Sequence, residues 1–175
     1  INGDVGTIDL LPDGDILITG TFSQVNGQSA SVIARLNADG TIDPSFAPSS
    51  GPNTRISCVW KAPDGRFVVG GEFTTYDGVQ RSRIAGLLPD GTLDESFDPG
   101  TGANATVQCI AAQPDGSLLI GGSFTAYDGI GRNRIARIHG YTRAGIRVML
   151  EGPYSGGQMT DALRTLPSFP LTEPF

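Results

Sequence analysis

The fold is decided by the stretch Leu11-Pro12-Asp13-Gly14-Asp15-Ile16-Leu17-Ile18-Thr19-Gly20-Thr21-Phe22, which the chain repeats twice more with substitutions. Its Pro-Asp-Gly turn recurs at Pro63 and Pro114, a step of 51 residues each time. The same step relates further sets of identical or similar residues: Gly20, Gly71 and Gly122; Phe22, Phe73 and Phe124; and the runs 33–36, 84–87 and 135–138. An internal repeat of this length indicates a repeat architecture such as a solenoid or a propeller.

Each copy alternates short apolar runs with tight-turn residues, as the strands and turns of an antiparallel meander do. The Pro-Asp-Gly turn separates the first two runs, and an Asn-Gly or Asp-Gly pair, which favours a two-residue hairpin, comes before the third. The middle run, such as Phe67-Val68-Val69, is apolar at every position, which predicts a strand covered on both faces. The glycines that follow this run predict a bulge or a close backbone approach. A short fourth strand is expected to end at Phe46 in the first copy and at Phe97 in the second.

These features predict an all-β, β-propeller-like array of three 51-residue antiparallel blades with a short C-terminal extension. The blades are expected at about 1–51, 52–102 and 103–140, and residues 141–175 form the extension or the start of a following domain. A single blade cannot bury both of its faces, so each blade should pack on its neighbour. Because propellers use about four to eight blades, we expect a partial or open ring. Either further blades precede Ile1 in a longer gene product, or an open arc is capped by the tail or by a partner.

The repeat resembles the delta-60 repeat family, which occurs in large secreted or surface-attached bacterial proteins. The resemblance rests on Leu-Pro-Asp-Gly-x-Ile-Leu-x-x-Gly-x-Phe, on the Asn/Asp-Gly pair, and on Ile-Ala-Arg-Leu-Asn-x-Asp-Gly-x-Ile-Asp-x-x-Phe, and it covers about four fifths of the chain. It implies a β-propeller-like fold, and no activity is generally assigned to the family. The third copy departs from the pattern after Ile138, where His139-Gly140-Tyr141-Thr142 replaces the expected turn.

The tail has a different character. The segments 147–154, 157–164 and 170–175 are similar to a region near the C-terminus of large bacterial surface proteins. This similarity implies a following β domain and makes secretion by the type IX route plausible. From the residues alone, 146–150 is expected to be a strand and 159–166 at most a short helix.

Composition excludes several classes of function. The net charge is −6, with 12 basic and 18 acidic residues, and Lys61 is the only lysine. A phosphate-tracking nucleic-acid binder is therefore disfavoured, because such proteins need a basic surface. No apolar run reaches the ~18 residues that a membrane-spanning helix requires, so we expect neither a nucleic-acid partner nor a membrane span.

Cys58, Cys109 and His139 are the residues to weigh for catalysis or metal binding. The cysteines are 51 residues apart and so take equivalent positions in neighbouring units. A disulfide needs Cα atoms within ~7 Å, so we expect two unpaired cysteines that serve as small buried hydrophobes on inner strands. His139 stands where the repeat breaks, and the chain has no Gly-x-Ser-x-Gly turn, which favours a surface turn over a catalytic triad.

A calcium site is the one metal site that the sequence suggests, and turn chemistry explains the same residues. The segments 37–43 and 90–95 place oxygen side chains on a Gly turn, as the start of an EF-hand loop does. The bidentate Glu that completes such a loop is missing, and Asp-Gly turns need no metal. We expect neither a metal nor another cofactor.

The candidate binding residues lie around the Asp-Gly turns of the second and third copies. Tyr76 and Tyr127 precede these turns, and each is interpreted either as a ring that stacks on a sugar or a partner side chain or as a hydrophobic plug beneath the loop. The repeated basic pairs are Arg81 with Arg83 and Arg132 with Arg134. These arginines could capture carboxylate or sulfate groups, but ion pairing between repeats with Asp43, Asp94 or their neighbours is favoured.

The function expected from the sequence is a non-enzymatic binding or adhesion platform. By analogy with the family, we expect the module to belong to a large secreted or cell-surface bacterial protein, with a protein or glycan partner and contacts to the rest of its own longer chain. The alternative is a structural spacer or secreted cargo segment with no ligand. A carbohydrate-active enzyme is disfavoured, because it needs a non-repeated pair of acids in a pocket.

Overall fold

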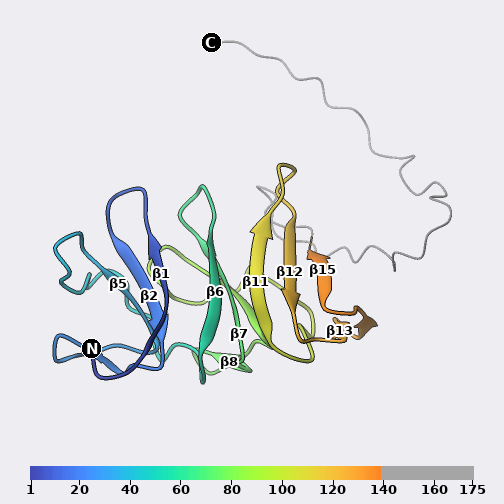
Figure 1. Ribbon diagram of the computed structural model, residues 1–175, viewed down its shortest axis with the longest axis horizontal. Coiled ribbons are helices and arrows are strands. Elements are labelled where there is room, and N and C mark those ends of the chain that lie inside the picture. The colour runs from blue at the N-terminus through green and yellow to red at the C-terminus, as the bar shows by residue number, and fades with distance from the viewer. Residues whose placement is uncertain (139–175) are drawn as a thin grey trace, which may run out of the picture.

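The computed structural model describes residues 1–138 of the 175-residue chain, and Figure 1 shows them as three small antiparallel sheets side by side. Each sheet has three strands, and we call it a blade. The strands are β1 (Val5–Leu10), β2 (Ile16–Gly20) and β5 (Ile33–Leu36) in blade 1, β6 (Ile56–Lys61), β7 (Phe67–Gly71) and β10 (Ile84–Leu87) in blade 2, and β11 (Val107–Ala112), β12 (Leu118–Gly122) and β15 (Ile135–Ile138) in blade 3. The described residues contain no helix, so the predicted all-β fold is confirmed.

The middle strand of each blade is the most deeply buried, as its continuous apolar sequence predicts. All five residues of β7 are buried, because it pairs with β6 on one side and β10 on the other while its two faces meet blades 1 and 3. The Pro-Asp-Gly turn precedes this strand in each copy, and its glycine takes a positive φ, which is 88° at Gly65. The turn therefore sets the register in which the first and the middle strand of each blade pair.

The glycine that closes each middle strand is required by a close backbone approach. The pairing of β6 with β7 shifts between Ile56 and Cys58, which leaves one extra residue on β6 opposite Gly71. A Cβ at Gly71 would lie 2.4 Å from the carbonyl oxygen of Arg55. The other two blades repeat this bulge, so the predicted close approach is confirmed.

A two-residue hairpin follows each middle strand. These hairpins are β3 (Gln24–Val25) with β4 (Gln28–Ser29), β8 (Thr75–Tyr76) with β9 (Val79–Gln80), and β13 (Ala126–Tyr127) with β14 (Ile130–Gly131). Both turn residues take positive φ, 49° at Asp77 and 78° at Gly78, as a type I′ turn needs. The predicted hairpins are confirmed.

The prediction of a fourth strand is wrong. Only a single bridge joins Leu36 to Ile42 in blade 1, and Leu87 to Leu93 in blade 2. The chain then turns, because the carboxylate of Asp43 accepts hydrogen bonds from the backbone N–H (2.8 Å) and the hydroxyl (2.7 Å) of Ser45. This turn directs Phe46 into the core instead of extending the sheet.

The hydrophobic core lies between the blades. Leu17 and Ile33 of blade 1 share one cluster with Ile56 and Phe67 of blade 2. A second cluster joins residues of blade 2 to residues of blade 3, among them Val68, Ile84, Val107, Leu118 and Ile120. Burial of each such side chain contributes roughly 1.5–3 kcal/mol. The expectation that each blade packs on the next is therefore confirmed.

The connectors between blades are tied to the hairpin of the following blade. Asp77 Oδ1 accepts hydrogen bonds from the backbone N–H groups of Ser50 (2.8 Å) and Gly51 (2.7 Å). Asp128 Oδ1 accepts one from the backbone N–H of Thr101 at 2.9 Å. The aspartate of each Asp-Gly turn thus also fixes the chain that enters its blade.

The three blades form a row that does not close into a ring within residues 1–138 (Figure 1). That part of the chain contains no helix long and apolar enough to cross a bilayer. His139 and the predicted extension, 141–175, lie outside the described residues.

Candidate functional site

The two tyrosines that the sequence singles out are both fully buried. The Tyr76 hydroxyl donates a hydrogen bond to the carbonyl oxygen of Gly91 at 2.8 Å, and its ring packs edge-on against Phe73. Burial raises the pKa of both tyrosines well above the usual value. Neither ring offers a face to a ligand, so the structure favours the hydrophobic plug beneath the loop.

Three of the four arginines near the hairpins donate side-chain hydrogen bonds to backbone carbonyls of their own blades. Arg81 Nη1 donates to the carbonyl of Gln80 at 2.9 Å, and Arg132 Nη1 donates to that of Gly131 at 3.0 Å. Arg83 donates to the carbonyls of Glu72 and Phe73. Arg83 and Arg134 both have left-handed backbones, with φ of 71° and 69°. Of these residues, Arg83 lines a hollow of about 370 Å³ between blades 2 and 3.

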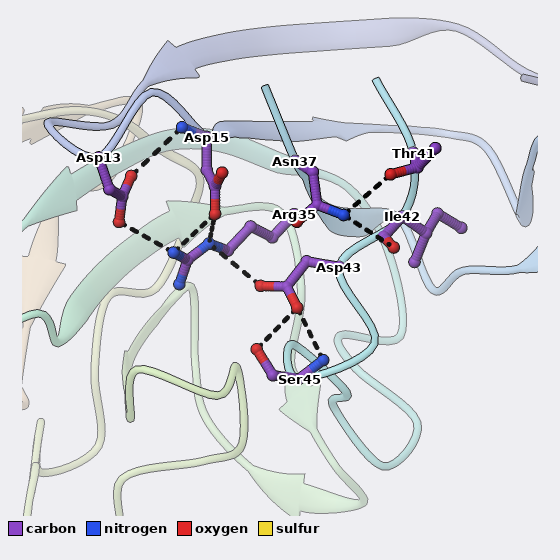
Figure 2. A network of polar contacts seen from close by, with 8 residues as sticks. All are labelled: Asp13, Asp15, Arg35, Asn37, Thr41, Ile42, Asp43 and Ser45. Atoms are coloured by element: carbon purple, nitrogen blue, oxygen red, sulfur yellow. Dashed lines mark hydrogen bonds and ion pairs between the residues drawn. The ribbon is translucent and has the colours of Figure 1, made fainter. Parts of the chain in front are cut away.

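The ion pairs formed within residues 1–138 involve other arginines. Figure 2 shows the guanidinium of Arg35 among three carboxylates: Asp13 at 2.9 Å, Asp15 at 2.7 Å and Asp43 at 3.3 Å. In blade 2, Arg66 lies 3.3 Å from Asp94. The expected pairing of Asp43 and Asp94 with the arginines near the hairpins is therefore wrong. The guanidinium that reaches these carboxylates comes from the strand or turn beside them.

The oxygen side chains considered for calcium make local hydrogen bonds. Asp39 accepts from the backbone N–H of Thr41 at 2.9 Å and from its hydroxyl at 2.6 Å, and the hydroxyl bond does most to lower the pKa of Asp39. Asp90 does the same with Thr92. Within residues 1–138, no group of three or more His, Cys, Asp or Glu side chains could hold a metal ion.

Both cysteines are free thiols, and their surroundings differ. Cys58 faces blade 3, where its Sγ lies 3.9 Å from the carbonyl oxygen of Val107, and burial raises its pKa to about 12. Cys109 takes the equivalent position in blade 3, but it is exposed, so the expectation that both cysteines are buried is wrong for Cys109. A thiol with so high a pKa is a poor nucleophile near neutral pH, so Cys58 is a packing residue.

A cavity of about 670 Å³ lies between blades 1 and 2, beside their Pro-Asp-Gly turns. Its walls are mainly apolar and include Leu10, Leu17, Val59 and Phe67. Three charged side chains also line it: Asp9, Lys61 and Asp64. Its volume and its mix of apolar walls with a few polar groups are typical of small-ligand pockets.

The cavity lies where the copies differ in sequence. Asp9 of blade 1 corresponds to Trp60 of blade 2, and Lys61 corresponds to Ala112 of blade 3. Trp60 packs against the core cluster that joins blades 2 and 3. The much smaller Asp9 leaves the corresponding space between blades 1 and 2 open, and Lys61 borders that space from the opposite blade.

Two of the three charged side chains of the cavity, Asp9 and Lys61, form no ion pair with each other. Lys61 Nζ lies 5.9 Å from the centroid of the Phe67 ring, and it makes no ion pair with any residue of 1–138. Burial raises the pKa of Asp9, and a hydrogen bond from Thr7 opposes the increase. By contrast, a hydrogen bond from Arg66 lowers the pKa of Asp64.

Reasoning from the sequence missed this cavity, because it followed the residues that the copies share. Asp9 and Lys61 stand out once the three copies are aligned at the 51-residue step, since each puts a charge where another copy has an uncharged residue. The residues that reveal the cavity in the sequence are those that differ between the copies, and no shared motif indicates it.

The family model described as a domain of unknown function (DUF5122) beta-propeller matches residues 11–46, 62–97 and 113–139, one segment in each copy. No curated protein and no solved structure matches the chain.

Proposed function

The chain belongs to the DUF5122 beta-propeller family, and from this premise we propose that it is a non-enzymatic binding module whose site is the cavity between blades 1 and 2. The observation that carries the proposal is the clustering of Asp9 and Lys61, which depart from the other copies, around one hollow. A spacer needs only the shared residues of the repeat, because these already build and pack the blades. Charges placed in an otherwise apolar wall provide specificity for a ligand.

The occupant that best fits the cavity is a segment of a partner protein with an apolar side chain next to an acidic one. The apolar side chain would lie against Leu10, Leu17 and Val59, and the carboxylate would meet the unpaired Lys61. A glycan usually needs an exposed aromatic face on which to stack. Phe67 is 1% exposed, and the two candidate tyrosines are fully buried, so no such platform borders the cavity among the described residues.

Selection of peptides tests this proposal. A random peptide library displayed on phage and panned against the chain should yield acidic sequences with an apolar neighbour. The variant Asp9→Trp copies the residue of blade 2 and fills the cavity, so it should reduce the affinity at least tenfold. Glu95→Trp, an exposed acidic position outside the cavity, is the control and should leave binding unchanged. Selected peptides that bind Asp9→Trp equally well would contradict the site. If the wild type binds a glycan and Asp9→Trp does not, the ligand of the cavity is a glycan instead of a peptide.

One observation favours an enzyme as the second candidate. Asp9 and Asp64 both line the cavity, and their pKa values shift in opposite directions, as those of an acid and a base do. However, Asp64 belongs to the Pro-Asp-Gly turn present in all three copies, and Arg66 lies 2.7 Å from its carboxylate. These facts support a structural role for Asp64. Turnover of chromogenic glycosides that is lost in Asp9→Asn would favour the enzyme.

We also propose that the module belongs to a secreted or cell-surface bacterial protein. The support is the resemblance of the repeats and of the tail, and the type IX route is the secretion pathway that the tail implies. Antibodies against the chain should label intact cells or the culture medium of the source bacterium. Labelling confined to the lysate would contradict this placement.

A further inference from the structure

We infer that the hollow between blades 2 and 3 is a second binding site, which takes a small ligand by an oxyanion group: a carboxylate, a sulfate or a phosphate. We call it the hairpin hollow, because it lies at the end of the blades where β8 and β13 lie (Figure 1). It shares no lining residue with the cavity between blades 1 and 2, so each site can be tested by itself.

The walls of the hairpin hollow come from two neighbouring blades. Blade 2 supplies Thr74, Ser82 and Arg83, and the connector and hairpin of blade 3 supply the rest, including Thr101 and Asn104. Its volume of about 370 Å³ lies near the lower end of the range for ligand pockets, ~300–1,000 Å³. The hollow therefore suits a small molecule or a single unit of a larger one.

Arg83 is the only charged side chain that lines the hairpin hollow. It forms no ion pair with any residue of 1–138. Its Nη1 donates to the carbonyls of Glu72 and Phe73, whereas its Nε and Nη2 have no hydrogen-bond partner in that part of the chain. Two neighbouring guanidinium nitrogens match the spacing of two oxygens of one anionic group. The uncompensated charge therefore favours an oxyanion as the ligand.

The guanidinium is fixed by the segment that it contacts. The backbone N–H of Arg83 donates to the carbonyl of Phe73 at 2.8 Å, and the Arg83 carbonyl accepts from the N–H of Gly71 at 3.0 Å. Nη1 also reaches the Phe73 carbonyl, at 3.4 Å. Backbone and side chain are thus held by the same strand end, and a donor that is ordered before the ligand arrives loses less conformational entropy on binding.

Two hydroxyl groups add to the donors of the hairpin hollow. Thr74 Oγ1 accepts a hydrogen bond from Asn53 Nδ2 at 2.9 Å, which leaves its own O–H to donate. The Ser82 hydroxyl has no hydrogen-bond partner within residues 1–138. The Thr101 hydroxyl instead donates to Asp128 Oδ1 at 3.3 Å, and the same oxygen accepts from the Thr101 backbone N–H at 2.9 Å. Asp128 does not line the hollow, so an oxyanion there meets a guanidinium and two hydroxyls.

The positive charge is a departure from the first copy. At the 51-residue step, Arg83 corresponds to Val32 in blade 1 and to Arg134 in blade 3, whereas Thr74 and Ser82 both correspond to serines in blade 1. The left-handed backbone is present with either residue, because φ is 46° at Val32 and 71° at Arg83. The fold therefore does not require an arginine at this position, and the charge is explained by a ligand.

A chemical-shift titration of the whole ¹⁵N-labelled chain tests the site. Sodium sulfate, sodium phosphate and sodium acetate are three separate probes, and sodium chloride at the same ionic strength is the reference. We expect at least one oxyanion to shift the Arg83 Nε–H and the Ala103 backbone N–H resonances saturably, and chloride to shift neither. A response to sulfate or phosphate alone assigns a tetrahedral group, and a response to acetate alone assigns a carboxylate. No saturable shift with any of the three overturns the proposal.

Variants place the binding at the hairpin hollow. Arg83→Gln removes the charge and should weaken binding at least tenfold. Arg55→Gln is the matched control, because Arg55 is exposed and does not line the hollow, and it should leave the affinity unchanged. Ser82→Ala removes a hydroxyl without a partner in residues 1–138, so it should keep the fold and weaken binding severalfold.

Two outcomes of the variant series contradict the site. Unchanged affinity in Arg83→Gln, or an equal loss of affinity in Arg55→Gln, overturns the proposal. Because the Arg83 side chain also holds the carbonyls of Glu72 and Phe73, the fold of Arg83→Gln is checked first by its amide spectrum. If that variant does not fold, Ser82→Ala decides alone, and unchanged affinity in it overturns the proposal.

Discussion

Arg66 and Asp94 form across blade 2 the ion pair that Arg35 and Asp43 form across blade 1, with 3.3 Å between nitrogen and oxygen in each, although the arginines come from different places. Arg35 lies on β5, whereas Arg66 directly precedes β7. Gly86 stands in blade 2 where Arg35 stands in blade 1. The second copy thus carries its guanidinium just before the middle strand instead of on the third strand, and it keeps the contact with the aspartate.

Loss of either partner should destabilise the chain, and loss of the aspartate should do so more. Asp94 also accepts hydrogen bonds from the backbone N–H (2.9 Å) and the hydroxyl (2.5 Å) of Ser96, and it is buried. We expect Asp94→Ala to lower the free energy of unfolding by roughly 2–3 kcal/mol and Arg66→Ala by roughly 1 kcal/mol. Urea denaturation measures both. Equal losses would mean that the turn at Ser96 contributes nothing.

Gly86 should tolerate no side chain. A Cβ at this position would lie 2.5 Å from the Cβ of Phe97, which is fully buried. Gly86→Ala should therefore lower the free energy of unfolding by roughly 2 kcal/mol through overpacking. Gly131→Ala is the matched control, because a Cβ there meets nothing within 4 Å. The control should shift the urea midpoint little, and similar midpoints for the two variants would refute the argument.

The two buried tyrosines should respond differently to removal of the hydroxyl. Tyr76→Phe leaves the carbonyl of Gly91 without its donor and should lower the free energy of unfolding by roughly 1–2 kcal/mol. The Tyr127 hydroxyl is buried and has no hydrogen-bond partner among the described residues. Tyr127→Phe should thus be neutral or stabilising. Thermal unfolding of the two variants side by side gives the comparison, and a larger loss for Tyr127→Phe would contradict it.

The stability of the chain should depend on pH through Asp9. Burial raises the pKa of Asp9 above the usual 3.8, so between the two values the folded chain binds more protons than the unfolded chain. Stability then falls as pH rises through this range. Asp9→Asn, which cannot ionise, should be more stable than the wild type at pH 7, and the difference should vanish below about pH 3.

Asp43→Asn is the control, because its effect on the stability at pH 7 should have the opposite sign to that of Asp9→Asn. Hydrogen bonds from Ser45 do most to lower the pKa of Asp43, so its ionised form stabilises the fold above the unfolded value of 3.8 and loses that effect as pH falls through the lower folded value. Asp43→Asn should therefore be less stable than the wild type at pH 7. Unfolding curves at several pH values measure both effects, and shifts of the same sign would rule out the assignment.

The repeat predicted the blades, turns and hairpins correctly because each is specified locally and three times over. The Pro-Asp-Gly turn, the apolar middle run and the Asp-Gly pair each have one favoured backbone geometry. The segment that ends at Phe46 was different. Its apolar residues suggested a strand, but the hydrogen bonds of Asp43 to Ser45 turn the chain after a single bridge.

Side-chain partners were harder to predict than strands. The pairing of Arg35 with Asp13, Asp15 and Asp43 depends on which face of the blade each residue occupies. Asn53 shows the same difficulty: its Oδ1 accepts from the backbone N–H groups of Thr74 (2.9 Å) and Thr75 (3.2 Å), 21 and 22 residues away. Asn2 and Asn104 repeat this contact at the 51-residue step, so the period could have revealed it.

The hydrogen bonds from Asp77 to the connector at Ser50 and Gly51 affect the order of events during synthesis. They link residues 26 and 27 positions apart, and the acceptor lies in the later blade. A nascent chain that has released blade 1 from the ribosome cannot fix the connector after that blade until the hairpin of blade 2 has also emerged. Each hairpin therefore fixes the connector that leads into its own blade, and this contact forms only after the hairpin has been synthesised.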